Sequence, residues 1–327
     1  RRVMKIDAAN PLRIGLLAAS KIAAPAVIAP ANARADVAVT AVAARDPARA
    51  RAYAETHGIA AVAEDYAALI ARDDVDVVYV GNPISGHAEW TIRAAEAGKA
   101  VLCEKAFALD AGEGRAMVAA AKAADRPLLE AFHYRFHKVI RRAEAIVRSG
   151  ELGRLTGAHA TFDAVIPYDA DEIRWRADQG GGALGDLGSY PAHALRTLIG
   201  AEPDVTAATI EMWEGVDAAT AAELRFPGDL EASLRCSMVA ERFDATLTLT
   251  GEDGELSIRN FVGPQMGCSF RVRVGDQTRS EPTDGPTTYA AQLDHLVAVM
   301  QGEVTPLTGG ADAIANLALM DAIRAAA

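Results

Sequence analysis

Small residues follow the first apolar segment of the chain with the spacing of a dinucleotide-binding turn. Such a turn has the pattern G-x-G-x-x-G, because larger side chains would block the tight turn, the approach of a pyrophosphate and the packing of helix on strand. Ala18, Ser20 and Ala23 occupy these positions here. The opening N–H groups of the next helix and the Ser20 hydroxyl would bind a phosphate; a small-residue turn without a ligand is the alternative. The expected cofactor contacts in this turn are Gly15, Ala18, Ser20, Lys21 and Ile22.

The end of the second predicted strand, over residues 37–43, bears on the choice between NAD and NADP. An NAD enzyme usually places Asp or Glu here to accept hydrogen bonds from the ribose hydroxyls, whereas this chain has Ala44 followed by Arg45. Arg45 is then available for a 2′-phosphate, which favours NADP(H); a solvated Arg45 side chain is the alternative. Asp46 precedes Pro47 and is interpreted as the N-cap of a helix.

Strands and helices alternate in the first part of the chain. The apolar run over residues 75–80 is continuous, as expected of a strand covered on both faces. Helices between successive strands require right-handed crossovers, so the pattern predicts a parallel, doubly wound α/β sheet. The predicted strands cover residues 12–18, 37–43, 75–80, 100–103 and 128–130, and the predicted helices cover residues 22–31, 47–56, 87–97 and 111–124.

The pattern changes after about residue 150, where strand candidates follow one another closely with glycine turns between them. This predicts an antiparallel or mixed sheet. We therefore expect a Rossmann domain over residues 1–130 and an α+β domain with an open, mainly antiparallel sheet over residues 131–327. The later strands are predicted over residues 206–212, 221–226, 231–238, 245–250, 255–258 and 270–274, and three helices end near residues 198, 300 and 325.

The composition of the chain argues against some classes of partner and some cellular locations. A formal net charge of −11 argues against nucleic acid as the main partner. The three cysteines have no metal-type spacing and suggest neither a zinc site nor a disulfide framework, so we expect no metal and a cytoplasmic location. No apolar run is long enough for a membrane span.

The predicted helices cannot cover both faces of the second sheet, which predicts a homodimer or homotetramer formed through that sheet.

Two further segments carry motifs of a known family. The run AGKAVLCEK spans residues 97–105, and Gly81-Asn82-Pro83 precedes His87. These segments resemble the Gfo/Idh/MocA family, named after glucose–fructose oxidoreductase, inositol dehydrogenase and rhizopine catabolism, and the resemblance covers nearly the whole chain. In the family the last lysine of AGK-x-V-x-x-EKP points at the nicotinamide and the substrate. The cofactor contacts implied by the resemblance are Asn82, Pro83, His87, Glu104 and Lys105; an N-terminal helix residue is the alternative reading of His87.

The segment over residues 180–193 resembles the family element GGG-x-L-x-D-x-G-x-H-x-x-D. By this resemblance Asp186 takes the aspartate role, Tyr190 stands in the place of the histidine, and His193 stands where a second acid often occurs. Spacings of four and three would put these residues on one helix face. Alternatively, Pro191 places the start of the helix near Tyr190, with Ser189 as its cap.

The resemblance implies that these residues are catalytic. A phenol with a pKa of about 10 is a poor acid–base group at neutral pH, but the cation of Lys105 would stabilise the phenolate of Tyr190 and lower that pKa. Tyr190 would then exchange the proton of the substrate hydroxyl, while Asp186 and His193 orient the substrate.

Four more residues are candidates for substrate contact: Arg135, Arg174, Trp175 and Arg176. Each has ion pairing between domains or packing as its alternative. The function implied by the family is NAD(P)-dependent hydride transfer between nicotinamide and a sugar, cyclitol or vicinal diol. A non-catalytic cofactor-binding sensor and an NAD-dependent glycoside hydrolase on the same fold are the two alternative functions.

Overall fold

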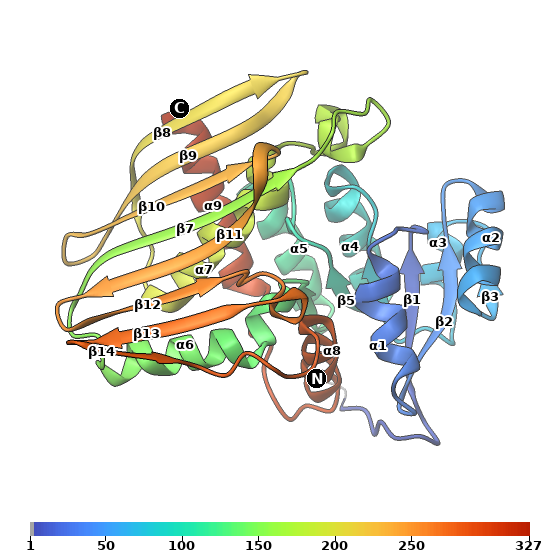
Figure 1. Cartoon of the computed structure of the whole chain (residues 1–327). Coiled ribbons are helices and arrows are strands. Elements are labelled where there is room, and N and C mark those ends of the chain that lie inside the picture. Colours follow the sequence, from blue (N-terminus) through green and yellow to red (C-terminus); the bar gives the residue numbers. More distant parts are fainter. Residues whose placement is uncertain (1–2) are drawn as a thin grey trace. The chain divides into compact units, whose positions relative to one another are not determined.

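The computed structural model describes residues 3–327 of the chain and leaves out residues 1 and 2 (Figure 1). The chain divides into two compact units. The first unit contains the residues up to Phe132 together with Tyr289–Ile314, and the second contains His133–Thr288 and Ala315–Ala327. The chain thus leaves the first unit after Phe132 and later returns to it, so the first unit also includes a segment from the C-terminal part of the sequence.

The first unit is built on a parallel sheet of six strands in the order β3-β2-β1-β4-β5-β6. This order confirms the predicted doubly wound sheet. The order reverses between β1 and β4, and ligands of such sheets bind in the crevice at the carboxyl ends of the strands at this point. The strands are β1 (Leu12–Leu17), β2 (Val37–Ala43), β3 (Ala61–Val62), β4 (Val77–Val80), β5 (Ala100–Cys103) and β6 (Leu128–Glu130).

The helices of the first unit begin and end largely where sequence signals place them. Asp46 accepts a hydrogen bond from the Ala48 N–H at 2.9 Å, which confirms it as an N-cap, and Gly58 closes the same helix at φ 67°. The predicted helix over residues 22–31 differs because it opens with a π-helical turn. The helical elements are η1 (Ala24–Ile28), α1 (Ala29–Asn32), α2 (Pro47–His57), α3 (Tyr66–Ile70), η2 (Ile84–Gly86), α4 (His87–Glu96), α5 (Ala111–Ala123) and α8 (Thr288–Met300).

The second unit is built on an eight-stranded sheet in the order β14-β13-β12-β11-β7-β10-β9-β8. β7 pairs parallel with β10 and antiparallel with β11, and the sheet is mainly antiparallel, as predicted. Buried and half-buried residues alternate along β9 and β12, so one face of the sheet forms the core. The strands are β7 (Leu155–Val165), β8 (Asp204–Trp213), β9 (Val216–Phe226), β10 (Leu230–Ser237), β11 (Val239–Gly251), β12 (Gly254–Arg259), β13 (Ser269–Val274) and β14 (Gln277–Ser280).

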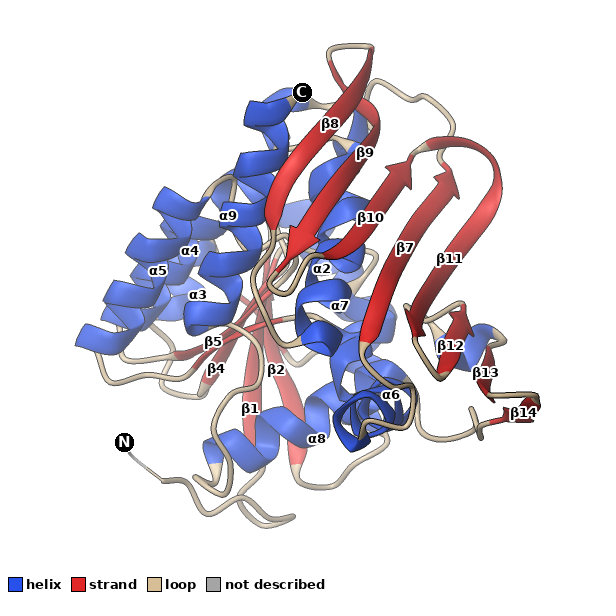
Figure 2. Cartoon of the chain, turned by 90° about the vertical axis from the view of Figure 1, so that its left-hand side faces the viewer, coloured by secondary structure: helices blue, strands red, loops and turns tan. Residues whose placement is uncertain are grey.

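Helix α7 packs on β7 and β10, and Figure 2 shows the strands of this sheet in red with α7 behind them. None of the helices within residues 3–327 is long and apolar enough to cross a membrane. The other helical elements of this part are η3 (His133–Phe136), α6 (Lys138–Ser149), η4 (Ile173–Trp175), η5 (Ala177–Gln179), η6 (Leu184–Gly188), α7 (Ser189–Ile199), η7 (Pro264–Met266) and α9 (Gly310–Ala326), which crosses from the first unit into the second.

Candidate active site

The turn after β1 adopts the backbone conformation that a glycine usually provides. Ala18 has φ +82°, and its N–H donates to the Ala43 carbonyl at the end of β2 at 2.9 Å. A left-handed conformation costs an L-residue roughly 1 kcal/mol. The chain therefore accepts local strain to keep the shape of the dinucleotide turn although no glycine is present, and strain of this kind concentrates at functional sites.

Two side chains of α2 hold this turn. Arg49 donates to the Ala19 carbonyl and the Tyr53 hydroxyl donates to the Ser20 carbonyl, each at 2.9 Å. Arg45 is exposed and directly precedes Asp46, the N-cap of α2. Burial raises the pKa of Tyr66, and the charges of Arg45 and Arg49 oppose this shift. The sequence prediction included Arg45 but not Arg49.

Unpartnered buried oxygens lie at the carboxyl ends of β1 and β4. Ser20 Oγ and Asn82 Oδ1 are buried and have no hydrogen-bond partner among the described residues. A Cβ built on Gly81 would lie 3.1 Å from Ser20 Oγ, which brings the two loops side by side. Buried polar groups are normally satisfied. These orphaned oxygens at the switch point of the sheet therefore fit a bound dinucleotide, while the predicted contacts Lys21 and Ile22 are exposed beside them.

Lys105 lies after β5 on a segment fixed by Glu104. The Glu104 carboxylate accepts from the Tyr79 hydroxyl at 2.7 Å and from the Lys105 N–H at 3.2 Å, and its side chain is buried. Burial, then the neighbouring Glu104 charge, raises the pKa of Tyr79 well above its usual value. The Lys105–Ala106 peptide bond is cis. Glu104 thus links the buried Tyr79 side chain to the backbone of Lys105 and fixes the start of the lysine segment.

His87 connects the loops that follow β4 and β5. Its Nε2 lies 2.9 Å from the Asn82 carbonyl and its Nδ1 lies 2.9 Å from the Ala106 carbonyl, and the ring is 1% exposed. Burial chiefly lowers the pKa of His87, and the hydrogen bonds to the Asn82 and Ala106 carbonyls oppose this shift, because two acceptors favour a ring with an N–H on each nitrogen. These contacts favour a positioning role for His87 next to Pro83 and Lys105.

In the second unit, the glycine run is required by close contacts. Gly182 has φ +126°, and a Cβ there would lie 1.9 Å from Asp217 Oδ1 on β9. The other carboxylate oxygen of Asp217 accepts from the Leu184 N–H at 2.6 Å, at the start of the helical segment. Burial raises the pKa of Asp217. Asp217, which the sequence prediction did not include, therefore anchors the segment that carries Asp186 and Tyr190.

This segment is helical from Leu184 onward, through the π-helical turn η6 and then α7. The alternative that Ser189 caps a helix starting near Tyr190 is wrong, because Gly188 and Ser189 are themselves helical and no side-chain cap is present. Pro191 lies directly after the change from π to α geometry, and the carbonyl four residues before it belongs to Leu187 of η6. π-Helical turns are rare and frequently occur at functional sites.

Asp186 forms an ion pair with Arg174. Arg174 Nε donates to Asp186 Oδ2 at 2.8 Å, and Glu172 lies on the same guanidinium at 3.3 Å. The pKa of Arg174 is raised, first by the charge of Asp186 and also by Glu172 and Tyr190. The structure thus pairs Asp186 with Arg174, a contact that the sequence analysis did not predict.

The Tyr190 hydroxyl is buried in a polar and aromatic cluster. Its oxygen lies 2.9 Å from Nε2 of His133, and Tyr190 is only 4% exposed. The Tyr134 hydroxyl lies 2.6 Å from Nδ1 of His193, which is also buried. The rings of Tyr134 and Phe162 pack edge to face on Tyr190, with centroids 5.6 Å and 5.4 Å away. The sequence prediction singled out neither His133 nor Tyr134.

The other predicted substrate residues have partners of their own. Arg135 is buried in a two-bond ion pair with Glu144, at 2.7 and 2.8 Å. Trp175 is 4% exposed, and its indole N–H donates to the Pro167 carbonyl. Arg176 pairs with Asp178 at the surface. These contacts favour the packing or ion-pair alternative for Arg135, Trp175 and Arg176, and they leave Arg174 next to the site.

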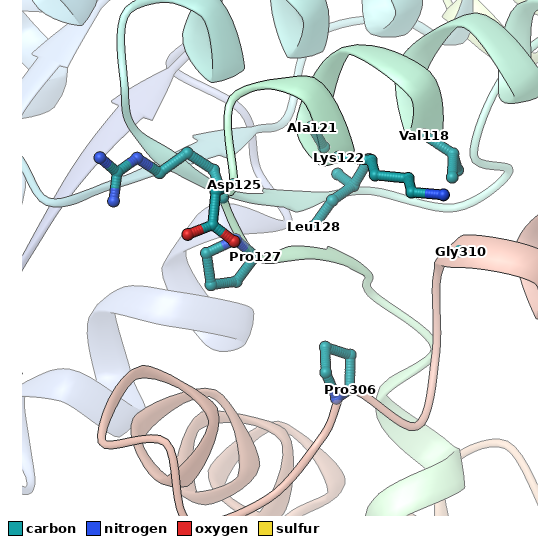
Figure 3. A pocket seen from close by; sticks show the side chains of 9 residues that line it. Val118, Ala121, Lys122, Asp125, Pro127, Leu128, Pro306 and Gly310 are labelled. Carbon is teal, nitrogen blue, oxygen red and sulfur yellow. The ribbon is translucent and has the colours of Figure 1, made fainter. Parts of the chain in front are cut away.

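Two hollows in the first unit lie away from these residues. One of about 290 Å³ is lined by Lys122, Asp125, Leu128 and Pro306 among others, as shown in Figure 3. A second of about 430 Å³ is lined by Arg13, Asp76 and Lys99. Both include residues at the beginnings of strands, whereas the candidate cofactor site lies at strand ends, so we do not assign either hollow to the active site.

Two family models match the chain. Residues 12–132 match an oxidoreductase family with an NAD-binding Rossmann fold, and residues 140–257 match the GFO/IDH/MocA C-terminal domain. The chain therefore belongs to the GFO/IDH/MocA family of NAD(P)-dependent oxidoreductases. This confirms the family, the fold and the enzyme class that the sequence motifs predict.

Similar proteins cover nearly the whole chain. A dTDP-3,4-didehydro-2,6-dideoxy-alpha-D-glucose 3-reductase from Streptomyces violaceoruber is 33% identical over 98% of this chain and 97% of that protein. D-xylose 1-dehydrogenase (NADP(+)) 2 from Haloferax volcanii is 30% identical over 95% of this chain and 96% of that protein. The crystal structure of KijD10, a 3-ketoreductase from Actinomadura kijaniata in complex with NADP and TDP-benzene, matches with a TM-score of 0.89 at 27% identity, over 97% of this chain and 98% of that chain.

Proposed function

We propose that this chain is an NADP(H)-dependent oxidoreductase that interconverts an alcohol and a carbonyl group on a sugar, cyclitol or vicinal diol. The observation that carries the proposal is the buried Tyr190 hydroxyl, hydrogen-bonded to His133 and near the Arg174–Asp186 ion pair. A tyrosine with these neighbours suits proton exchange with a substrate hydroxyl. The names of the two relatives, a sugar 3-reductase and a xylose dehydrogenase, support the substrate class.

The cofactor would supply or accept a hydride. The strained turn at Ala18 and the orphaned oxygens of Ser20 and Asn82 support its binding at the switch point of the sheet. Arg45 and Arg49 supply positive charge for a 2′-phosphate, which agrees with the NADP named for the xylose dehydrogenase and for the KijD10 complex. The residues proposed to hold the cofactor are Ala18, Ser20, Lys21, Ile22, Arg45, Arg49, Asn82, Pro83 and Lys105. The predicted contact Gly15 is not among them, because it lies inside β1 with Leu69 and Val75 packed against it.

The roles of the remaining residues follow from charge and hydrogen bonding. Tyr190 takes the hydroxyl proton in oxidation and returns one in reduction. The role of stabilising its phenolate is given to Lys105 by the family resemblance. Asp186, held by Arg174, accepts a hydrogen bond from a substrate hydroxyl. His193, held by Tyr134, is proposed to orient the substrate. His87 and Glu104 position the loops on the cofactor side.

Two substitutions test this function. Turnover of NADP⁺ with D-xylose and with trans-cyclohexane-1,2-diol is measured for the wild type, Tyr190→Phe and Lys105→Ala. Loss of an acid–base group is expected to lower kcat by about 100-fold or more, because general acid–base catalysis contributes on the order of 10²–10⁴. Cofactor binding, measured by NADPH fluorescence, is expected to survive in Tyr190→Phe, which separates loss of chemistry from loss of folding.

The same measurements separate the alternative functions. Cofactor binding without turnover on any tested polyol would support a sensor. Cleavage of a glycoside without accumulation of NADPH or NADH would support a glycoside hydrolase. Turnover that is equal in the wild type and in Tyr190→Phe would contradict the proposed role of the tyrosine.

We further infer that the protein works as a homo-oligomer in the cytoplasm. Cys103 and Cys236 are buried free thiols, which suits a reducing compartment. The open face of the second sheet supports assembly and is considered below.

A further inference from the structure

His133 lies between two hydroxyl groups. Its Nε2 lies 2.9 Å from the Tyr190 hydroxyl oxygen, and its Nδ1 lies 2.8 Å from Oγ1 of Thr288. His133 is 6% exposed and Thr288 is fully buried. Packing alone does not require a histidine here, since burying an imidazole costs free energy that an apolar ring of similar size would avoid. The ring is held by both nitrogens, so its orientation toward Tyr190 is fixed.

Gln265 completes the chain of polar contacts behind His133. The Thr288 N–H donates to Gln265 Oε1 at 3.4 Å, which orients the amide and leaves its Nε2 to donate to Thr288 Oγ1 at 3.2 Å. Thr288 Oγ1 still has a lone pair for an Nδ1–H of His133. In that arrangement Nε2 faces Tyr190 either as an acceptor or, when the ring is charged, as a donor.

We propose that His133 is the proton partner of Tyr190, the group that restores the tyrosine to its starting protonation state in each turnover. The inference rests on the proposed function, because it assumes that Tyr190 exchanges a proton with the substrate. His133 acts through Tyr190 and is therefore a positioning residue and proton partner, without contact to the substrate being required.

The proton balance is complete in both directions. In reduction, Tyr190 gives its proton to the substrate oxygen and becomes a phenolate. The imidazolium of His133 then breaks its Nε2–H bond and forms the O–H bond of Tyr190, which leaves a neutral imidazole with its proton on Nδ1, facing Thr288. Once the product has left, a solvent proton binds the Tyr190 oxygen and the hydroxyl returns its own proton to Nε2, which restores the imidazolium. In oxidation, each of these steps runs in reverse.

Other charged and titratable groups of the second unit lie around this pair. Tyr134 packs on Tyr190 from η3 and binds His193 of α7, while Arg174 of η4 and Asp186 of η6 form the neighbouring ion pair. Arg174 and Asp186 are of opposite charge and paired, so they act on Tyr190 in opposite directions. Tyr190 and His133 are hydrogen-bonded to each other, so the protonation state of one is expected to affect the titration of the other.

The test follows the ionisation of Tyr190 directly. The ultraviolet absorbance of tyrosinate is recorded against pH for the wild type and for His133→Asn, each with Tyr190→Phe in the same background subtracted. At the alkaline pH where a tyrosine ionises, His133 is neutral and its Nε2 accepts the Tyr190 O–H, which favours the phenol. His133→Asn is therefore expected to shift the midpoint of the Tyr190 signal downward by about one pH unit. An unchanged midpoint would overturn the proposal.

A matched control exists on β7. His159 also lies between two hydroxyls, Ser233 Oγ at 2.8 Å and Thr161 Oγ1 at 2.7 Å, but it belongs to the open face of the sheet. His159→Asn is expected to leave the Tyr190 midpoint where it is in the wild type. A shift of the same size in His159→Asn would also count against the proposal, because the effect would then not be specific to His133.

Two additional readouts keep the inference separate from folding and from the proposed function. The pH dependence of the imidazole ¹⁵N chemical shifts of His133 is expected to change in Tyr190→Phe. This measurement leaves His133 itself intact. If His133→Asn turns over D-xylose, the acid limb of its kcat profile is expected to be lost and kcat to fall roughly tenfold, with little change in KM. Full activity of Tyr190→Phe would refute the proposed function, whereas the tyrosinate titration would still decide whether His133 and Tyr190 titrate together.

Discussion

Single residues at the candidate cofactor site are arranged at a cost to the fold. A buried polar atom without a partner costs about 1–3 kcal/mol, and Ser20 Oγ and Asn82 Oδ1 both lack one. Ala18 adds backbone strain at φ +82°. These three costs fall on neighbouring loops at one end of the sheet. A ligand with hydrogen-bonding groups at this position would offset them, which is why we read them as preparation for binding.

At the same scale, the two arginines near α2 are expected to select the cofactor. Arg45→Ala should weaken NADPH binding by roughly tenfold to a hundredfold, the value of one or two charge-assisted hydrogen bonds, and leave NADH binding nearly unchanged. Arg49→Ala should weaken both, because Arg49 also holds the Ala19 carbonyl of the turn. Nicotinamide fluorescence titrations measure all four affinities.

The control is Arg51→Ala on the same helix. Residues two apart on a helix do not share a face, so Arg51 points away from Arg49 and its loss changes the net charge equally without touching the site. Equal losses of NADPH affinity in Arg45→Ala and Arg51→Ala would mean that general charge, and no contact with the 2′-phosphate, determines the preference.

Residue types and spacing were sufficient to propose Lys105, Asp186 and Tyr190 as site residues, because these stand in contiguous motifs. They were insufficient for His133, which meets Tyr190 across 57 positions of sequence. Arg49 and Asp217 were missed for the same physical reason: their partners are backbone groups of a distant turn and of a distant helix start. A motif records neighbours along the chain, while these contacts are created by the packing of helix on strand.

At the scale of elements, the alternation of apolar runs with helices was enough to predict that the sheet of the first unit is parallel and doubly wound. The prediction missed α6, although its buried residues Val139, Ile140, Ala143 and Ile146 recur at helical spacing. It also missed β7, whose partners β10 and β11 come much later in the chain. The π-helical turns η1 and η6 depend on the fit of a segment against its neighbours, which composition does not express.

Another element-scale feature is the anchoring of the end of β14 to α6. Glu281 follows β14, and its side chain is 8% exposed while it accepts two hydrogen bonds from Arg142 and one from Arg279. The hydrogen bonds from Arg142, then that from Arg279, lower its pKa from the usual 4.5. A lowered folded-state pKa contributes stability above pH 4.5, and this contribution is lost as the pH falls through the folded-state value.

Glu281→Gln is therefore expected to lower the free energy of unfolding by about 1–2 kcal/mol near neutral pH, and by less once the wild-type carboxylate is protonated. Urea unfolding at neutral pH and in acid measures the difference. Glu252→Gln is the control, since its ion pair with Arg154 is half exposed on both sides and should contribute little at either pH. A Glu281→Gln loss that is the same at both pH values would contradict the assignment to the carboxylate.

At the scale of the whole molecule, the two faces of the second sheet differ in chemistry. Leu247, Leu249 and Ile258 point to the buried face and are 0% exposed. Thr248 and Ser257, which pair across β11 and β12, alternate with them and lie on the opposite face. Figure 2 shows α7 of the same unit behind these strands. By the same alternation Glu231 and Arg235 of β10 and Arg259 of β12 lie on this face. A homo-oligomer formed through it would have a polar interface of hydroxyl groups, paired charges and water.

If the oligomer forms through this face, an unpaired charge introduced at its centre is expected to prevent assembly. Thr248 lies in the middle of β11 and pairs with His159 of β7 as well as with Ser257 of β12, so a residue placed there meets the centre of the face. Thr248→Arg would bury an unpaired charge between two copies and is expected to shift the protein to a monomer in light scattering, while the wild type stays oligomeric. Ala119→Arg, on the exposed side of α5, adds the same charge away from the sheet and should leave the oligomer intact. If the wild type is a monomer at micromolar concentration, or if Thr248→Arg assembles like the wild type, the sheet face is not the interface.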